Sequence, residues 1–116
     1  MTLKMVVIVY IISKFFDMIM NHKNIAQAFK VLGGSERIKI IRYLSTGEKC
    51  VCGIFKHLKL SQNLVSYHLS ELRKNNLIIA RKSGKWVYYS LNEKSIKELK
   101  TFLFEVLQKE KSNHTC

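Results

Sequence analysis

Apolar residues recur every three or four positions along most of this chain, which is the spacing that places them on one side of a helix. The pattern predicts a first helix over residues 2–20, a second that Asn24 caps, a third that Ser35 caps and a short fourth over about residues 49–58. No proline occurs, and Gly33-Gly34 is a suitable end for the second helix. The chain is therefore predicted to be mainly α-helical.

A fifth predicted helix follows the short turn at Lys59-Leu60, so the chain reads helix, turn, helix at this point, with Ser61 placed as the cap. Its inward side is apolar and carries Leu64, Val65, Leu69 and Leu72. Its outward side is rich in donors and acceptors that suit base edges and phosphate oxygens: Gln62, Asn63, Ser66, Tyr67, Ser70 and Arg73. His68 lies in the same motif, where a DNA contact or a structural hydrogen bond is expected. These residues form the predicted DNA-reading surface; an ordinary solvated face is the alternative.

A β-hairpin is predicted after this helix. Residues 77–81 contain β-branched side chains, residues 82–85 contain a glycine turn and residues 86–91 return as an aromatic strand. The tip is basic and carries Arg81, Lys82 and Lys85. A basic hairpin beside a DNA-reading helix lies along the phosphate backbone or enters the minor groove, so these three residues are predicted DNA contacts.

A last helix is predicted from its cap at Asn92 to about Lys111. Its apolar stripe carries Ile96, Leu99, Leu103, Val106 and Leu107, with Phe102 and Phe104 beside it. This stripe is longer than a small core requires, and residues 2–20 also present a wide apolar face. We therefore expect both helices to pair in a two-fold homodimer that holds two DNA-reading helices about one DNA turn, roughly 34 Å, apart.

The expected organisation is an N-terminal helix over residues 1–23, one domain over residues 24–111 and a flexible tail over residues 112–116. The apolar segment near the start has no small-residue cleavage site and is too short to span a bilayer, so no membrane association is expected. Two alternatives stay open for this segment: a translation start at Met18 or Met20, which would make the upstream residues an artefact of the reading frame, and a helix on a membrane surface.

The charge balance indicates a polyanionic partner. The chain of 116 residues has 20 Lys and Arg against 8 Asp and Glu, a formal net charge of +12. Release of counterions from phosphates makes double-stranded DNA the expected partner, although an excess of lysine also serves solubility. The sequence shows no set of nucleophile, base and orienting group, no glycine-rich phosphate loop and no carboxylate pair, so an enzyme is not expected.

Three cysteines supply the remaining chemistry. Cys50 and Cys52 stand just before the predicted DNA-reading helix, and Cys116 ends the sequence. An odd number at this spacing does not form a secreted disulfide framework, and a bridge between Cys50 and Cys52 would be strained, so we expect reduced thiols in the cytoplasm. Residues two apart on an ideal helix point to different sides, so both sulfurs are expected to hold one ion only if the first turn is distorted or irregular.

These elements and motifs resemble the ArsR/SmtB family of winged helix-turn-helix repressors over about residues 25–107. Residues 29–33 and 36–41 are similar to the family's first two core helices, residues 61–73 to its recognition motif and residues 84–91 to its wing. The resemblance implies a winged helix-turn-helix fold, mainly α with a β-hairpin wing, and a dimer formed through the N-terminal and C-terminal helices.

The segment around Cys50 and Cys52 resembles the family's metal-binding box, which implies that these thiolates bind As(III), Sb(III) or a soft divalent ion and that DNA is then released. The box commonly has a third cysteine three residues on, where this chain has Phe55. Cys116 of either subunit is a candidate third ligand, and a tail residue without a role is the alternative. The family's zinc site on the last helix has no match in residues 93–100, so no zinc or nickel site is expected there.

Three functions are consistent with these features. The first is a dimeric repressor that a soft metal or metalloid releases from operator DNA, with no ion required for DNA binding itself. The second keeps the DNA-binding module and makes the cysteines a thiol redox or reactive-sulfur sensor, which acts through an intermolecular disulfide or a persulfide. The third is a constitutive DNA-binding protein in which the cysteines have no role.

Overall fold

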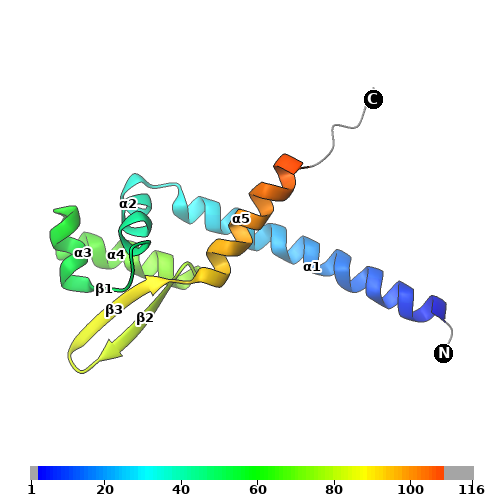
Figure 1. The fold of residues 1–116 in the computed structure, drawn as a ribbon, viewed down its shortest axis with the longest axis horizontal. Helices are drawn as coiled ribbons and strands as arrows, with labels where there is room; N and C mark the ends of the chain where they lie inside the picture. Colours follow the sequence, from blue (N-terminus) through cyan, green and yellow to red (C-terminus); the bar gives the residue numbers. More distant parts are fainter. Residues whose placement is uncertain (1–2, 109–116) are drawn as a thin grey trace.

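The computed structural model describes residues 3–108, without the side chains of residues 15–21. In this part of the chain the elements, shown in Figure 1, are α1 (Leu3–Leu32), α2 (Ser35–Leu44), β1 (Lys49–Cys50), α3 (Val51–Leu58), α4 (Gln62–Lys74), β2 (Ile78–Ser83), β3 (Trp86–Leu91) and α5 (Glu93–Gln108). The mainly helical architecture with a β-hairpin confirms the predicted winged helix-turn-helix fold, in which α3 and α4 are the two helices of the motif and β2–β3 is the wing.

The core lies where α2, α3 and α4 meet the base of the hairpin. Its most deeply buried side chains are below 2% exposure and come from these elements: Ile40, Ile54, Val65, Leu69, Leu72 and Leu77. The C-terminal part of α1 adds Ile25, Ala28 and Val31, and α5 adds Leu99. Because the core ends at these residues, the first half of α1 and the second half of α5 project away from it (Figure 1).

The apolar spacing of residues 35–44 predicts Ile38 in the core beside Ile41 and Leu44, and both this position and the predicted core position Leu64 are wrong. Ile38 is 46% exposed and Leu64 is 40% exposed. The buried stripe of α2 runs through Ile40 and Leu44, and that of α4 begins at Val65. Since each residue turns a helix by about 100°, Ile38 and Leu64 lie well away from these stripes.

The N-terminal boundaries also differ from the prediction. α1 is one continuous helix, so Asn24 lies inside it and caps nothing. Neither glycine nor proline occurs between its ends, and the helix stops only before Gly33. The N-cap of α2 is Gly34, not Ser35, whose hydroxyl donates to Glu36 Oε1 at 3.3 Å.

The predicted fourth helix begins two residues later than expected. Lys49 and Cys50 form β1, which pairs antiparallel with β3 in the sheet order β1-β3-β2. Gly47, at φ +127°, turns the chain into this strand. The register places Cys50 opposite Tyr88, so the first cysteine belongs to the same sheet as the wing.

The wing is confirmed and is longer than predicted. Ser83 pairs with Trp86, which leaves a two-residue connection whose Gly84 has φ +59°. The predicted caps of the neighbouring helices are confirmed as well: Ser61 Oγ accepts from Leu64 N at 3.2 Å, and Asn92 Oδ1 accepts from Ser95 N at 3.4 Å.

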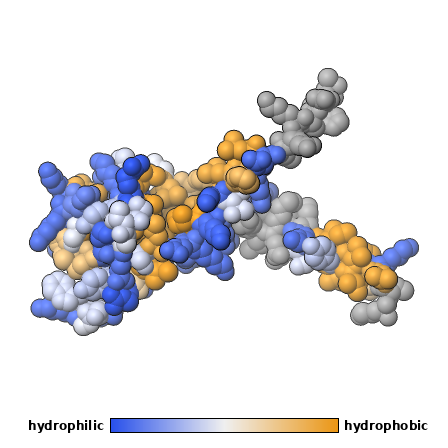
Figure 2. Space-filling view, in the orientation of Figure 1, coloured by the Kyte–Doolittle hydropathy of each residue, from blue (hydrophilic) through white to orange (hydrophobic). Residues whose placement is uncertain are grey.

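An apolar surface extends over the projecting parts of α1 and α5. On α1 it consists of Leu3 and residues 5–12, and on α5 of Leu103, Phe104, Val106 and Leu107, all at least half exposed or nearly so. Figure 2 shows these two apolar regions at the ends of both helices. Phe102 of α5 packs on the C-terminal half of α1 and holds the two helices together. Its ring centroid lies 6.5 Å from that of His22 and 6.2 Å from that of Phe29. No helix within residues 3–108 reaches the length and apolar character needed to cross a bilayer.

Candidate DNA interface and thiol pair

α4 presents the predicted DNA-reading surface to solvent. Its polar residues are exposed along one side of the helix: Gln62, Asn63, Ser66, Tyr67, Ser70 and Arg73. Val65, Leu69 and Leu72 fix the opposite side in the core. The Ser61 oxygen accepts the capping bond, which leaves its hydroxyl proton for an acceptor outside the helix. The surface therefore offers both donors and acceptors to a duplex groove.

His68 differs from the rest of this surface. It is half-buried, and its Nδ1 accepts a hydrogen bond from Arg37 Nε at 3.1 Å. The structural hydrogen bond expected at His68 is therefore present. Nothing local in the sequence pairs these residues, because they are 31 positions apart.

The wing carries its three predicted cations on the surface, but one of them is already bound. Arg81 donates to both carboxylate oxygens of Glu48, at 2.7 and 3.0 Å, and its guanidinium lies 4.8 Å from the centroid of Tyr88. Lys82 and Lys85 are exposed, and Lys85 Nζ lies 5.3 Å from the centroid of Trp86. Sequence reasoning missed Glu48, since its position near the wing depends on the unpredicted strand β1.

The ion pair also changes the acid strength of Glu48. The hydrogen bond from Arg81 holds the pKa of this carboxyl below its ordinary value. A lowered folded-state pKa means that the pair is present at neutral pH and is lost as the pH falls through that lowered value.

The two cysteines lie together at the N-terminus of α3. Cys50 is the N-cap with extended backbone, φ −68° and ψ 146°, and Cys52 is in the first turn. Their sulfurs are 3.0 Å apart, and both side chains are half-buried free thiols. Cys50 precedes the helix with extended backbone, so helical geometry does not turn its side chain away from Cys52.

The thiol pair is polarised. The Cys52 thiol donates to the Cys50 sulfur and lowers the pKa of Cys50, and backbone N–H groups at the helix start act in the same direction. The same contact raises the pKa of Cys52, because its proton is held in the hydrogen bond. Cys50 is therefore the more acidic thiol of the pair.

For a metal ion at this site, the described residues supply two ligands, the sulfurs of Cys50 and Cys52. Within residues 3–108, no group of three His, Cys, Asp or Glu side chains could hold a metal ion. The predicted third ligand, Cys116, lies outside the described residues. Two sulfurs on one tetrahedral ion, each at about 2.3 Å, lie about 3.8 Å apart, so the observed pair needs only a small opening to hold a soft ion.

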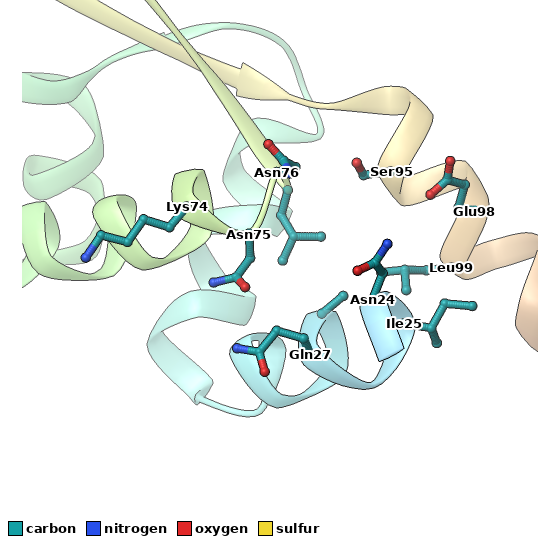
Figure 3. Close-up of a pocket in the computed structure, with 11 residues that line it drawn as sticks. Asn24, Ile25, Gln27, Lys74, Asn75, Asn76, Ser95, Glu98 and Leu99 are labelled. Carbon is teal, nitrogen blue, oxygen red and sulfur yellow. The ribbon is translucent and has the colours of Figure 1, made fainter. Parts of the chain in front are cut away.

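A polar cavity of about 250 Å³ lies elsewhere, between α1, the C-terminal end of α4 and α5 (Figure 3). None of the predicted site residues lines it. Two of its polar side chains already have partners: Lys74 Nζ lies 3.6 Å from Glu71 Oε1, and Asn75 Nδ2 donates to the Glu71 carbonyl at 2.8 Å. The cavity is separate from the thiol pair and from the DNA-reading surface.

Comparison with known proteins identifies the family. The family model for "Bacterial regulatory protein, arsR family" matches residues 34–80, which include β1, the thiol pair and all of α4. The arsenical resistance operon repressor of Staphylococcus aureus is 37% identical over 73 residues, which cover 63% of this chain and 70% of the repressor. This chain belongs to the arsR family. As an arsR-family protein it is a DNA-binding transcriptional repressor and not an enzyme, as the sequence predicts.

Two further comparisons concern a cadmium regulator and a protein solved in its reduced form. A cadmium resistance transcriptional regulatory protein, the CadC homolog of Staphylococcus aureus, is 39% identical over 88 residues, which cover 73% of each chain. The structure of reduced HlyU from Vibrio cholerae superposes with a TM-score of 0.64 at 27% identity and covers 81% of this chain and 98% of its own.

We expect Glu48→Gln to strengthen duplex binding and to steepen the dependence of log K on log salt by about 0.9 per subunit, because the released Arg81 gains one phosphate contact. Glu105→Gln on α5 removes the same charge far from the wing and serves as the control. The measurement is fluorescence anisotropy over a salt series. An unchanged slope in Glu48→Gln would show that Arg81 does not reach DNA even when released.

We expect the pH midpoint of Cys50 alkylation to lie below the ordinary thiol pKa, and this midpoint to rise in Cys52→Ala, which lacks the thiol donor. The rates are followed by tandem mass spectrometry in a Cys116→Ser background. Equal midpoints with and without the Cys52 thiol would contradict the polarised pair.

Proposed function

We propose that this arsR-family protein is a homodimeric repressor that leaves its operator when As(III), Sb(III) or a soft divalent ion binds Cys50 and Cys52. The observation that carries the proposal is the pair of sulfurs 3.0 Å apart, one of which, on Cys50, belongs to the strand that pairs with β3 of the wing. Thiolates are the ligands that soft ions prefer. The similar proteins from Staphylococcus aureus, a repressor of arsenical resistance and a regulator of cadmium resistance, support this ligand class.

DNA binding itself needs no ion in this proposal. The N-terminal part of α4 enters the major groove, where Gln62, Asn63 and Ser66 meet base edges, and the wing lies on the phosphate backbone through Lys82 and Lys85. These side chains are exposed without any contribution from the thiols. The unpaired thiols fit a reducing cytoplasm.

The effector signal passes from the thiol pair into the sheet. Cys50 pairs with Tyr88 of β3, and Tyr88 pairs with Arg81 of β2. Glu48, two residues before Cys50, holds the same Arg81. When an ion opens the sulfurs from 3.0 Å, β1 shifts against β3, and the wing changes its position relative to α4. The factor by which the ion lowers DNA affinity is set by how much more tightly the ion binds the shifted state than the DNA-binding state.

The homodimer forms through the apolar surface of α1 and α5. The side chains of residues 5–12 and of Leu103, Val106 and Leu107 are about half exposed or more and lie outside the core. A two-fold pairing of these helices covers them and places two α4 helices on successive major grooves.

A thiol redox or reactive-sulfur sensor is the second candidate, and the same sulfur contact favours it. A disulfide needs a separation of about 2.0 Å, so the observed 3.0 Å contact is about as near to a disulfide as to the spacing of about 3.8 Å on one ion. Cys50, the more acidic thiol, is the nucleophile that attacks an oxidant or the sulfur of a persulfide. The similar HlyU structure was determined for the reduced protein.

The test is fluorescence anisotropy of the reduced protein on its upstream DNA while arsenite is titrated under a non-thiol reductant. We expect DNA affinity to fall about 5-fold to 150-fold, and we expect this loss to disappear in Cys50→Ser and in Cys52→Ser. Cys116→Ser is the matched control for a cysteine outside the pair.

Release by arsenite in all three serine variants would contradict the assigned site. Retention on DNA with every soft ion, followed by release on oxidation, would replace the metalloid sensor with the redox sensor.

A further inference from the structure

We propose that Arg37 fixes His68 in the Nε2–H tautomer and so makes His68 a hydrogen-bond donor to duplex DNA. The inference rests on the DNA-binding role of α4 and does not involve the thiol pair. His68 lies directly after Tyr67, which is 54% exposed on the DNA-reading surface, and directly before the buried Leu69. It therefore stands at the edge between the core and the groove-facing side of the helix.

The identity of the donor decides the tautomer. Arginine carries only donors and stays protonated, so the 3.1 Å contact from Arg37 Nε requires a lone pair on His68 Nδ1. A neutral imidazole with an unprotonated Nδ1 carries its proton on Nε2. This assignment follows from the chemistry of arginine and needs no observed hydrogen.

Arg37 is itself held in place by three elements. It is on α2, its Nη1 donates to the Val31 carbonyl of α1 at 3.1 Å, and its Nε donates to His68 of α4. The Val31 carbonyl is in the last turn of α1, where carbonyl groups lack partners within the helix. The guanidinium also lies 5.7 Å from the centroid of the Tyr67 ring. Arg37 thus sets both the position of α4 against α1 and the tautomer of the His68 imidazole.

A fixed Nε2–H needs an acceptor, and a duplex offers two with the same chemistry. Purine N7 atoms accept in the major groove, and phosphate oxygens accept along the backbone. The Tyr67 ring, 5.3 Å from the His68 ring, packs beside the imidazole and limits its rotation. His68 is therefore a donor of set direction, in contrast to the mobile lysines of the wing.

The tautomer is measured first, on the full-length chain without DNA. Long-range ¹H–¹⁵N spectra of the imidazole distinguish protonated from unprotonated ring nitrogens. We expect His68 Nδ1 to be unprotonated and Nε2 protonated in the wild type, and a mixture of tautomers in Arg37→Gln. Arg42→Gln removes the same charge from an exposed position of α2 and should leave the tautomer unchanged. A protonated Nδ1 in the wild type would overturn the proposal even if the variant failed to fold.

The donor role is then measured as DNA affinity. In His68→Asn the amide oxygen takes the place of Nδ1 and keeps Arg37 bonded, but the Nε2 donor is lost. We expect about a 3-fold to 10-fold loss of affinity, the value of one hydrogen bond. If the loss of affinity depends on the identity of one base pair in the duplex, the acceptor is a base. If the loss is equal on all duplex sequences, the acceptor is a phosphate. Wild-type affinity in His68→Asn would overturn the donor role, while arsenite-induced release can succeed or fail independently.

Discussion

The antiparallel pairing of β1 with β3 is the constraint on which the chemistry of this protein depends. It takes Cys50 out of the helix and into an extended strand, and only there does its sulfur come within 3.0 Å of Cys52. The same pairing brings Glu48 within reach of Arg81 on the wing. A pair of thiols that would diverge on a regular helix becomes a polarised site, and that site lies on the sheet that forms the wing.

Much of the fold could be predicted because its signals are local. The apolar period of α4, the caps at Ser61 and Asn92 and the glycine turn of the wing are each read from a few neighbouring residues. β1 could not be predicted, since two residues carry no periodicity and their strand exists only because β3 pairs with them. The exposed Ile38 and the buried Ile40 show a similar limit, because several rotations of a short helix satisfy the same apolar pattern.

The candidate site could likewise be predicted only in part. Its residue types and order along the chain could be read from the sequence, but two of its cations have partners that are more than 30 positions away. Arg81 binds Glu48, and Arg37 binds His68 in addition to the nearby Val31 carbonyl. The count of 20 Lys and Arg therefore overstates the cations that are available to phosphates. Contacts of this range depend on the packing of α1, α2 and α4, which no local pattern specifies.

The most direct test of the central claim is amide hydrogen exchange of the reduced protein before and after arsenite binds. If the thiol pair acts through the sheet, protection at Tyr88 and Tyr89 of β3 and along the wing will change together with that of Cys50. A change confined to α3 and α4, with the β3 amides unaffected, would contradict this route and place the signal in the helices alone.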